Sequence, residues 1–449
     1  DYFGDGLSEE LLNALAGLDD LRVAARTSSF AFKGEDVDVR TIADSLGVET
    51  VLEGSVRRSE SRVRITVQLI EAEGGFQIWS EDFDRPLEGL LALQDEIAAS
   101  VVSALLPRLR GEDAARMRGG TENVAAYDEY LLGRQKWHTR DVPVLREAVE
   151  HFRRALALDS SFALAWSGLA DAIDGLAFRD TSALRLVPEA RLAALHALAL
   201  DPELAEAWTS AGVLAGEFDL DRTLAERALR RAIALRPSYA HAQRSLGGFM
   251  RNAGRVEEAR PHLELAVRLD PLSGLIRDGY GTLLLLAGEA AAAREQHEVA
   301  AGLEPAAFGG PLVWLADTLG LTPAEAAEAS IAYATGVGLP DPVAWGVVGR
   351  GIVDRTWRER ALAALAATEG LEPRARHQLE LALGDHEAAL EYLQALRDVG
   401  AGDLPTIGTR PQYDPLREDP RFIEIVRALA VPNGYDPVAQ APIWPEPAT

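Results

Sequence analysis

The segment from Ala197 to Trp208 reads ALALDPELAEAW, and related versions of it recur along the middle of the chain. The other versions read ALALDSSFALAW, AIALRPSYAHAQ, AVRLDPLSGLIR and VAAGLEPAAFGG. Each has a proline or serine at the same place, at Ser160, Pro202, Pro237, Pro271 and Pro305. The steps between these positions are 42, 35, 34 and 34 residues. This spacing predicts a structural unit that is repeated along the chain.

The inner positions of the repeat agree with one another as well as its period does. The third unit places small and large apolar residues at Leu246, Gly247, Met250, Ala259, Leu263 and Ala266, before Pro271. The fourth unit has the matching residues Tyr280, Gly281, Leu284, Ala293, His297 and Ala300, before Pro305. A period of about 34 residues with this pattern resembles the tetratricopeptide (TPR) repeat, in which small residues let two helices approach closely and the proline ends the second helix.

The repeat pattern fixes the expected limits of the helical part of the chain. We expect TPR repeats over residues 124–305 and divergent, TPR-like helical repeats over 306–400. The longer first step places extra residues near FRDTSALRLVPE, which we expect to form a longer loop between helices. Residues 401–449 should hold a capping helix, with Phe422, Ile425 and Leu429 on one face, and a proline-rich, poorly ordered tail.

Residues 1–110 have a different hydrophobic period, which predicts a small α/β domain. Leucines at 7, 11, 15 and 18 indicate a helix that Ser8 could cap, with Glu9 and Glu10 near its positive start. A short strand LRVAAR should follow, and then a helix from Val39 to Leu46 between Asp38 as cap and Gly47 as stop. Alternating residues predict three strands, at about 50–58, 62–71 and 76–83, with both helices on their apolar face. A last helix is expected at about 91–106.

This first part of the chain resembles the TolB-like amino-terminal (FlgO-like) domain. The resemblance lies in YFGDGLSEELLNAL, LRVAARTSSFAFKG, VRTIADSLGVETVLEGSVRR, VRITVQLI, QIWSEDFDR and LQDEIAASVV. Members of that family usually open with a further apolar strand, which has no counterpart before Tyr2, so we expect this sequence to be a fragment. The resemblance implies an output domain upstream: a winged-helix DNA-binding domain, an adenylate or guanylate cyclase, or a Ser/Thr kinase.

Four arginines surround the turn between the first two strands, at Arg57, Arg58, Arg62 and Arg64. The formal net charge of the chain is -25, and residues 1–110 alone hold 11 Lys and Arg against 21 Asp and Glu. A long-range field of this sign repels a phosphate backbone, so we expect no direct binding of nucleic acid by this segment. The arginines are interpreted as the solvent-facing side of a half-buried hairpin.

No motif for catalysis or for a cofactor rises above background in this sequence. The chain has no cysteine, and its eight histidines are scattered. We expect no catalytic residue, metal or cofactor in this segment, and GVVGRG at 346–351 lacks both a dinucleotide fingerprint and a preceding strand. The chain also has no apolar run near the roughly 20 residues of a membrane span.

The surface left for function is the concave face of the solenoid, where TPR repeats commonly bind peptides or helices. By the repeat register, the first helices of successive units present Ser167, Asp171, Thr209, His241, Arg244, Arg251 and Asp278. The resemblance does not reach the carboxylate clamp of chaperone-binding repeats, because Gly248 stands where an Asn is needed. These seven residues are the predicted partner-binding positions.

The sequence thus predicts a mainly α protein, with a small α/β amino-terminal domain followed by a TPR α-solenoid. Its predicted function is that of a non-catalytic sensory region of a bacterial signalling or transcription-regulatory protein, which binds a partner protein or peptide and regulates an upstream output domain. Two alternatives stay open: a regulatory part of a cyclase or kinase, and a stand-alone TPR scaffold. We expect a cytoplasmic or inner-membrane-associated location, and the sequence does not specify the oligomeric state.

Overall fold

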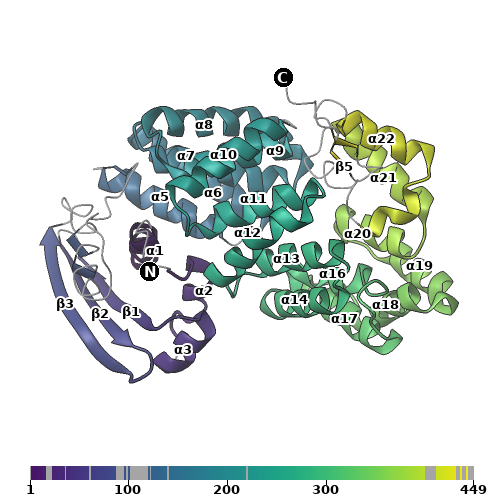
Figure 1. The fold of residues 1–449 in the computed structure, drawn as a ribbon, viewed down its shortest axis with the longest axis horizontal. Coiled ribbons are helices and arrows are strands. Elements are labelled where there is room, and N and C mark those ends of the chain that lie inside the picture. Colours follow the sequence, from purple (N-terminus) through teal and green to yellow (C-terminus); the bar gives the residue numbers. More distant parts are fainter. Residues whose placement is uncertain are drawn as a thin grey trace. The chain divides into compact units, whose positions relative to one another are not determined.

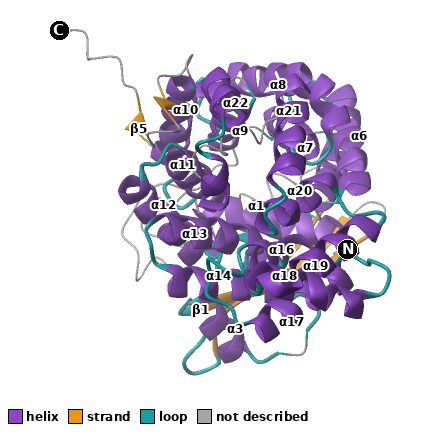
Figure 2. Ribbon diagram, turned by 90° about the vertical axis from the view of Figure 1, so that its right-hand side faces the viewer, coloured by secondary structure: helices purple, strands orange, loops and turns teal. Residues whose placement is uncertain are grey.

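Figure 1 shows the computed structural model of the 449-residue protein. It describes residues 2–16, 23–35, 37–59, 62–86, 96–97, 100–101, 120–121, 123–138, 141–218, 221–399, 411–430, 435–436 and 441–442. The chain forms two compact units. The first comprises Asp1–Ser245 with Arg268–Pro271, and the second comprises Leu246–Val267 with Leu272–Thr449. Helices dominate both, and the predicted fold class, mainly α with a small α/β part, is confirmed (Figure 2).

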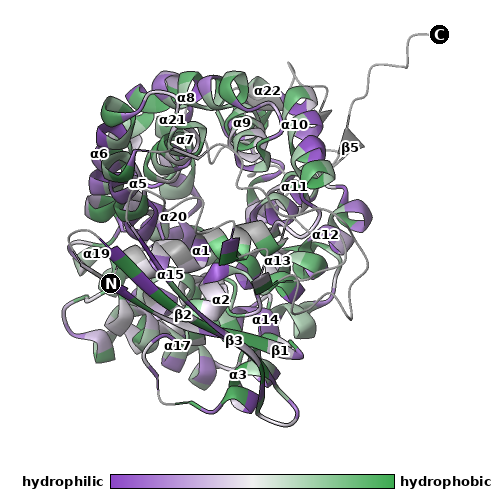
Figure 3. Cartoon of the chain, turned by 90° about the vertical axis from the view of Figure 1, so that its left-hand side faces the viewer, coloured by the Kyte–Doolittle hydropathy of each residue, from purple (hydrophilic) through white to green (hydrophobic). Residues whose placement is uncertain are grey.

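The first unit begins with a three-stranded sheet and three helices. The helices are α1 (Tyr2–Ala16), α2 (Arg26–Phe30) and α3 (Val39–Leu46), and the strands are β1 (Thr50–Arg58), β2 (Arg62–Glu71) and β3 (Phe76–Pro86). The strands form an antiparallel meander in the order β1-β2-β3, so the three predicted strands are confirmed. Along β2, Val63, Ile65, Val67 and Leu69 are buried, and the alternation of polar and apolar residues is visible in Figure 3.

The two predicted helices occupy different places on this sheet. Leu11 and Leu15 of α1 belong to the same buried cluster as the apolar side of β2. In contrast, α3 packs in a separate small cluster with Val51 and Ala72. The prediction that both helices cover one apolar face was therefore wrong for α3. Val51 pairs with Ile70, so its side chain lies on the face of the sheet opposite to Leu69 and the rest of the apolar side of β2.

The caps of α3 agree with the sequence, whereas the start of α1 does not. Asp38 accepts hydrogen bonds from the backbone N–H groups of Arg40 and Thr41, and Gly47 has a positive φ of 65°. Ser8, the predicted cap of α1, instead lies inside the helix and donates to the carbonyl of Gly4 at 2.9 Å. Helix α1 begins six residues earlier than Ser8, at Tyr2.

The predicted strand LRVAAR is wrong within the described residues 23–25, which form no strand before α2 begins at Arg26. The Ala25 N–H donates instead to the carbonyl of Leu269 at 2.6 Å, so this backbone bonds to a distant turn and not to a sheet. The helix predicted at 91–106 lies mostly outside the described residues. Its described residues Ile97 and Val101 are helical and fully buried against the sheet.

Antiparallel helix pairs follow the sheet and set the period of the chain. They are α5 (Val124–Trp137) with α6 (Val142–Leu158), α7 (Ala163–Ala177) with α8 (Val187–Leu200), α9 (Ala205–Glu217) with α10 (Arg222–Leu235), α11 (Ala240–Asn252) with α12 (Val256–Leu269), and α13 (Gly274–Leu286) with α14 (Ala290–Leu303). Each of the four predicted prolines lies two residues after the end of a second helix. The extra residues of the long step form a 3₁₀ helix, Thr181–Leu186, between α7 and α8.

The small residues of the repeat allow the close approach that the pattern predicts. A Cβ added to Gly247 would lie 2.7 Å from Cγ of Leu263, and one added to Gly281 would lie 2.8 Å from Nε2 of His297. Phe152 has no exposed surface, and its ring meets Gly133 of α5 and Gly168 of α7 in the same way. Phe152 therefore packs at the centre of the first three helices of the solenoid.

Helices continue through the rest of the second unit. They are α15 (Pro305–Phe308), α16 (Gly310–Trp314), α17 (Pro323–Gly336), α18 (Gly346–Val353), α19 (Arg358–Ala367), α20 (Pro373–Ala382), α21 (His386–Val399) and α22 (Pro420–Ala430), with 3₁₀ helices at Pro342–Trp345, Arg355–Trp357 and Pro411–Leu416. The predicted capping helix is α22, in which Phe422 and Ile425 are buried, while the side chain of Leu429 lies outside the described set. Of the predicted tail, two short strands, β4 (Tyr435–Asp436) and β5 (Ala441–Pro442), are described and pair antiparallel; its other residues lie outside the description.

A Phe152→Ala variant should lower the free energy of unfolding of the first unit by about 3–5 kcal/mol, because it removes a fully buried ring and leaves a cavity. Urea denaturation followed by circular dichroism measures this change. Leu195→Ala is the matched control, because Leu195 is 61% exposed and its truncation should change the stability little. Equal effects of the two substitutions would contradict the central packing of Phe152.

His377 of α20 predicts a pH dependence of the second unit. Its ring is buried beside Tyr392 and Tyr413, its Nε2 lies 3.0 Å from the Tyr413 hydroxyl, and burial, with the charge of Arg374, lowers its pKa to about 4. The unfolded chain therefore binds a proton below about pH 6.5 that the folded chain does not bind. Stability is full above that pH and falls as the pH drops toward 4, by at most about 1.4 kcal/mol per pH unit.

Urea denaturation between neutral pH and pH 4.5 tests this linkage. In His377→Gln the slope of stability against pH should be shallower than in the wild type. His386→Gln, which changes an exposed ring in the same unit, is the control and should keep the wild-type slope. An unchanged slope in His377→Gln would show that this ring does not titrate as its burial implies.

Candidate partner-binding site

The seven predicted positions fall in both units of the structure. Ser167 and Asp171 lie on α7, Thr209 lies on α9, and His241 and Arg244 lie on α11, all within the first unit. The second unit holds Arg251 and Asp278. The structure thus brings five of the predicted residues onto the first helices of successive pairs in one compact unit.

Buried hydroxyl groups join α7 to α9 on this face. Ser167 Oγ lies 3.1 Å from Ser210 Oγ, which donates to a carboxylate oxygen of Asp171 at 2.5 Å. Thr209 donates to the carbonyl of Ala205 at 2.8 Å. The Thr209 bond lies within α9, whereas the Ser167 contact joins the two helices; both residues are only 1% exposed and offer little surface to a partner. Asp171 is 8% exposed and serves the same network.

Aromatic rings connect α5 with α11. Trp137 stacks on His241, with ring centroids 5.8 Å apart and an interplanar angle of 14°, and its indole N–H donates to the carbonyl of Asp171 at 3.1 Å. Tyr239, two residues before His241 in the sequence, has its ring centroid 5.9 Å from that of His241. The ring of His241 therefore contacts one aromatic residue close in the sequence and one, Trp137, from the distant helix α5.

Arg244 is the residue on this face whose charge is best placed to meet a partner. Its guanidinium is partly buried, and one terminal nitrogen lies 3.3 Å from Ser245 Oγ. Burial lowers its pKa, and the charges of Glu217 and Asp174 oppose that change. Within the described part of the chain no carboxylate forms an ion pair with Arg244. This guanidinium stays charged at neutral pH, which makes it a candidate to meet an anionic partner.

Sequence analysis did not identify a buried ionic cluster between α1 and α5. Glu9 of α1 is 4% exposed and accepts from Arg134 Nε at 2.9 Å, with Arg26 Nε at 3.0 Å and His138 Nε2 at 3.5 Å. Burial alone would raise the pKa of Glu9, but the charges of Arg134, His138 and Arg26 hold it well below its usual range. Burial also lowers the pKa of His138 to about 3, against the effect of Glu9.

A second anchor joins α2 to the turn after α12. The backbone N–H and the hydroxyl of Ser28 both donate to one carboxylate oxygen of Asp270, at 3.0 and 2.6 Å, and Ser28 has no exposed surface. The Ala25 N–H bonds to Leu269 beside it. The segment from α1 to α2 is therefore fastened to the solenoid at its first helix and again beyond its fourth helix pair. The two residues of each contact, Glu9 with Arg134 and Ser28 with Asp270, are more than 120 residues apart in sequence, so no local pattern could reveal these contacts.

The two predicted residues in the second unit, Arg251 and Asp278, make polar contacts with neighbouring groups of the chain. Arg251 donates to the carbonyl of Gly279 at 2.8 Å. The Asp278 carboxylate lies 3.2 Å from Nδ1 of His297, a buried ring that the sequence assigned to a helix-packing position. Both residues thus link consecutive elements of that unit.

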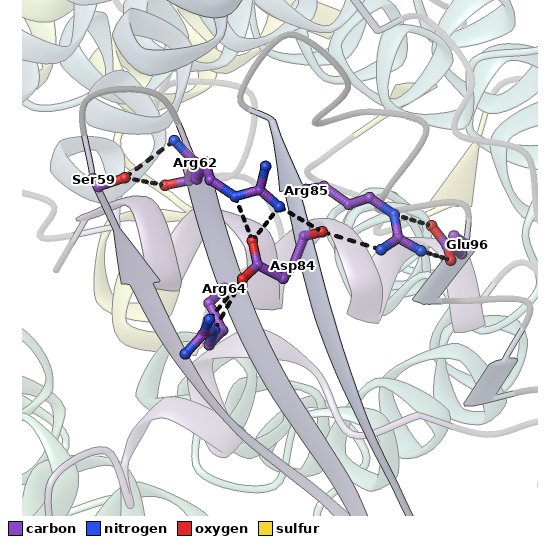
Figure 4. Close-up of polar contacts among 6 residues, drawn as sticks. All are labelled: Ser59, Arg62, Arg64, Asp84, Arg85 and Glu96. Atoms are coloured by element: carbon purple, nitrogen blue, oxygen red, sulfur yellow. Dashed lines mark hydrogen bonds and ion pairs between the residues drawn. The ribbon is translucent and has the colours of Figure 1, made fainter.

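The arginines of the β1–β2 hairpin lie where the sequence placed them. Arg57, Arg62 and Arg64 are exposed, and the latter two pair with Asp84 of β3 at 2.7 Å each (Figure 4). Arg85 on the same strand binds Glu96 at 2.5 Å. The interpretation of this turn as a solvated face is confirmed for these three arginines; the side chain of Arg58 lies outside the described set.

The described part of the chain contains no group of three or more His, Asp or Glu residues placed to hold a metal ion. None of its described helices combines the length and apolarity needed to cross a bilayer. Residues 346–351, with the glycine-rich sequence, lie in helix α18, which begins at Gly346.

Comparison with known proteins gives one sequence relative of note. The chain is 39% identical over 169 residues to "Putative adenylate cyclase 3" of Rhizobium meliloti (strain 1021). The match covers 37% of this chain and 29% of the relative, so the chain spans less than a third of the length of that protein. No family model matches the chain.

Solved structures with a similar arrangement of helices include a thermophilic TPR protein of Thermus thermophilus, TTC0263, with 22% identity and a TM-score of 0.33 over 40% of this chain and 92% of that one. The human IFIT1 dimer with PPP-AAAA has 14% identity and a TM-score of 0.45 over 95% of this chain and 94% of that one. Because both TM-scores lie below 0.5, the fold class rests on the helix pairs of this chain itself.

Replacing Glu9 by Gln should destabilise the first unit by about 3–5 kcal/mol, because it leaves the guanidinium groups of Arg134 and Arg26 buried without their counter-charge. Urea denaturation monitored by tryptophan fluorescence reports the loss, since Trp137 lies 4.8 Å from the Arg134 guanidinium. Glu147→Gln removes an ion pair of a carboxylate that is 58% exposed and should cost less than about 1 kcal/mol. A Glu9→Gln effect no larger than this control would refute the buried cluster.

Proposed function

We propose that this chain is a non-catalytic sensory and protein-interaction region, which binds a partner protein or peptide and regulates an output domain of a signalling protein. In this proposal, residues 1–110 form a TolB-like domain, 124–305 form TPR repeats, 306–400 form divergent repeats, and 401–449 hold the capping helix and the tail. The helix pairs and the sequence likeness to a putative adenylate cyclase support it.

The observation that carries the proposal is the double anchoring of the α1–α2 segment. Glu9 binds Arg134 on α5, and Ser28 binds Asp270, so one short segment is held at two separate places within the first unit. Stacked helix pairs change their curvature through small rotations at each interface. A partner that altered this curvature would therefore strain the α1–α2 segment. The amino-terminal domain would then sense occupancy of the solenoid by direct contact.

The proposed binding face is centred on Arg244 and His241. Arg244 carries a partly buried charge without an ion-pair partner in the described residues, and His241 presents a ring backed by Trp137. A charge in a partly desolvated position next to aromatic rings suits an extended peptide with a carboxylate. Ser167, Asp171 and Thr209 would support this face from beneath, and Arg251 with Asp278 are proposed as separate partner-binding positions within the second unit.

The regulated output is proposed to be an adenylate cyclase. The match to the Rhizobium meliloti protein favours this choice over the winged-helix and kinase alternatives, because it is a likeness of sequence at 39% identity. The enzymatic domain of such a protein would lie outside the residues described here.

Selecting peptides from a random display library on the whole chain, and measuring their affinity by fluorescence anisotropy, tests the binding face. For peptides that bind there, Arg244→Glu should weaken binding by about tenfold or more, because loss of a charge-assisted contact and repulsion both act. Arg227→Glu, which changes an exposed arginine of α10, should leave affinity unchanged. Amide hydrogen exchange in α1 should also change when the peptide binds.

Two results would contradict this proposal. If selected peptides bind Arg244→Glu and wild type equally, the face is in the wrong place. If peptides bind through Arg244 but exchange in α1 and α2 is unaffected, the solenoid binds partners without signalling to the amino-terminal domain.

A further inference from the structure

A cluster of arginines in the second unit differs from the rest of this acidic protein. Between Arg350 and Arg360 the sequence RGIVDRTWRER holds four arginines against one aspartate and one glutamate. It covers the end of α18, the 3₁₀ helix Arg355–Trp357 and the start of α19. We call Arg350, Arg355, Arg358 and Arg360 the arginine corner.

Two members of the arginine corner lie over a single tryptophan. The guanidinium carbons of Arg350 and Arg360 are 5.2 and 5.0 Å from the centroid of the Trp357 ring. Both arginines are exposed, and the ring holds their guanidinium groups in place by cation–π contacts at the surface. Such contacts reduce the entropy that two long side chains would lose on binding a ligand.

The other two members meet at a turn between α20 and α21. Arg358 donates to the carbonyl of Gly384 at 2.7 Å. A Cβ built on Gly384 would lie 3.1 Å from a terminal nitrogen of Arg358 and 3.5 Å from one of Arg355. The two guanidinium groups are thus neighbours on one side of this glycine, which itself has a positive φ of 80°.

The carboxylates nearest in sequence do not neutralise this charge. One oxygen of Asp354 accepts from the backbone N–H and the hydroxyl of Thr356, at 3.0 and 2.7 Å, and so caps the 3₁₀ helix. Glu359 is exposed and forms no ion pair with the corner among the described residues. Elsewhere in the same unit, arginines take carboxylate partners: Arg294 binds Glu298 and Glu325, and Arg421 binds Glu387 and Asp419.

The lack of ion pairs at the arginine corner among the described residues is unusual, because acidic residues outnumber basic ones by 70 to 45 in this chain. In such a background a surface arginine readily finds a carboxylate, yet none pairs with the four of the corner within the described residues. The like charges within each of the two arginine pairs, at Trp357 and beside Gly384, repel one another, and binding of an anion would offset this repulsion. The corner therefore resembles half of an ion-pair network whose other half is absent.

We propose that the arginine corner is a docking site for an acidic peptide segment of a partner protein, one that presents two or more carboxylates close together. Planar guanidinium groups bind carboxylates through paired hydrogen bonds, and four of them match a short run of Glu or Asp. Beyond the Debye length of about 8 Å, the acidic remainder of the surface is screened, so a short peptide responds mainly to the corner.

Nucleic acid fits this surface less well than an acidic peptide. A duplex that binds by its backbone is held by roughly 6–10 phosphate contacts, and its length would bring further phosphates against an acidic protein. A single strand is held by bases stacked on aromatic rings, but the ring of Trp357 is covered by two guanidinium groups. The corner suits a compact anionic ligand.

Fluorescence anisotropy with a fluorescein-labelled hexaglutamate peptide tests the proposal on the whole chain at physiological salt. Wild type should bind the peptide, and Arg350→Gln with Arg360→Gln should weaken binding by about tenfold or more. Arg355→Gln alone should also weaken it, and this exposed residue has no contact with Trp357 whose loss could disturb the fold. The matched control is Arg227→Gln with Arg231→Gln, two exposed arginines on α10 that give the same change in net charge.

Support requires that the corner variants lose affinity while the control pair keeps it, and that a hexaglutamine peptide does not bind. Equal losses in both pairs would show that only net charge matters and would overturn the proposal. Failure of wild type to bind hexaglutamate would also overturn it, as would tighter binding of a single-stranded oligonucleotide through the same arginines. The Arg244 face is unchanged in every variant, so these results stand apart from the proposed function.

Discussion

The close contact between paired helices is the constraint on which the rest of the structure depends. Where two helices cross, a glycine on one receives a large side chain from the other, as Gly133 and Gly168 receive the ring of Phe152 and Gly281 receives His297. Each such contact brings two backbones to a separation that a Cβ would prevent, and it fixes the angle between the helices. Repeating this contact at intervals of about 34 residues stacks the pairs and places their first helices side by side.

The amino-terminal segment depends on that stack for its own position. Helix α1 has an apolar side that contributes Leu11 and Leu15 to the sheet core, and a polar side from which Glu9 reaches Arg134 on α5. An ionised carboxylate is expensive to bury without a counter-charge, so Glu9 and Arg134 are stable only together. Because Ser28 forms a second buried contact with Asp270, this segment belongs to the same compact unit as the first helix pairs of the solenoid. The proposed sensory role follows from this physical continuity.

Prediction from sequence was most successful where a signal was local. The strands at 50–58 and 62–71 and helix α3 agree in their bounds, because alternation and caps depend on neighbouring residues. Prediction failed at the start of α1, which begins at Tyr2, and at Val23–Ala25, where the Ala25 N–H bonds to the distant carbonyl of Leu269. The repeat register correctly predicted the helices that carry Ser167 and Thr209. It did not predict that both residues are buried, because burial depends on how tightly α7 and α9 pack.

The class of the protein, its helix-pair period, its small meander sheet and the solvated character of the hairpin arginines could all be predicted from the sequence, because each follows from spacing along the chain. The contacts between distant side chains could not. Glu9 and Arg134, Trp137 and His241, and Ser28 and Asp270 come together from distant segments. The same holds for the arginine corner, where four arginines are visible in the sequence, but the lack of carboxylate partners among the described residues depends on folding. A charge pair depends on distance in space, and no period in the sequence encodes that distance.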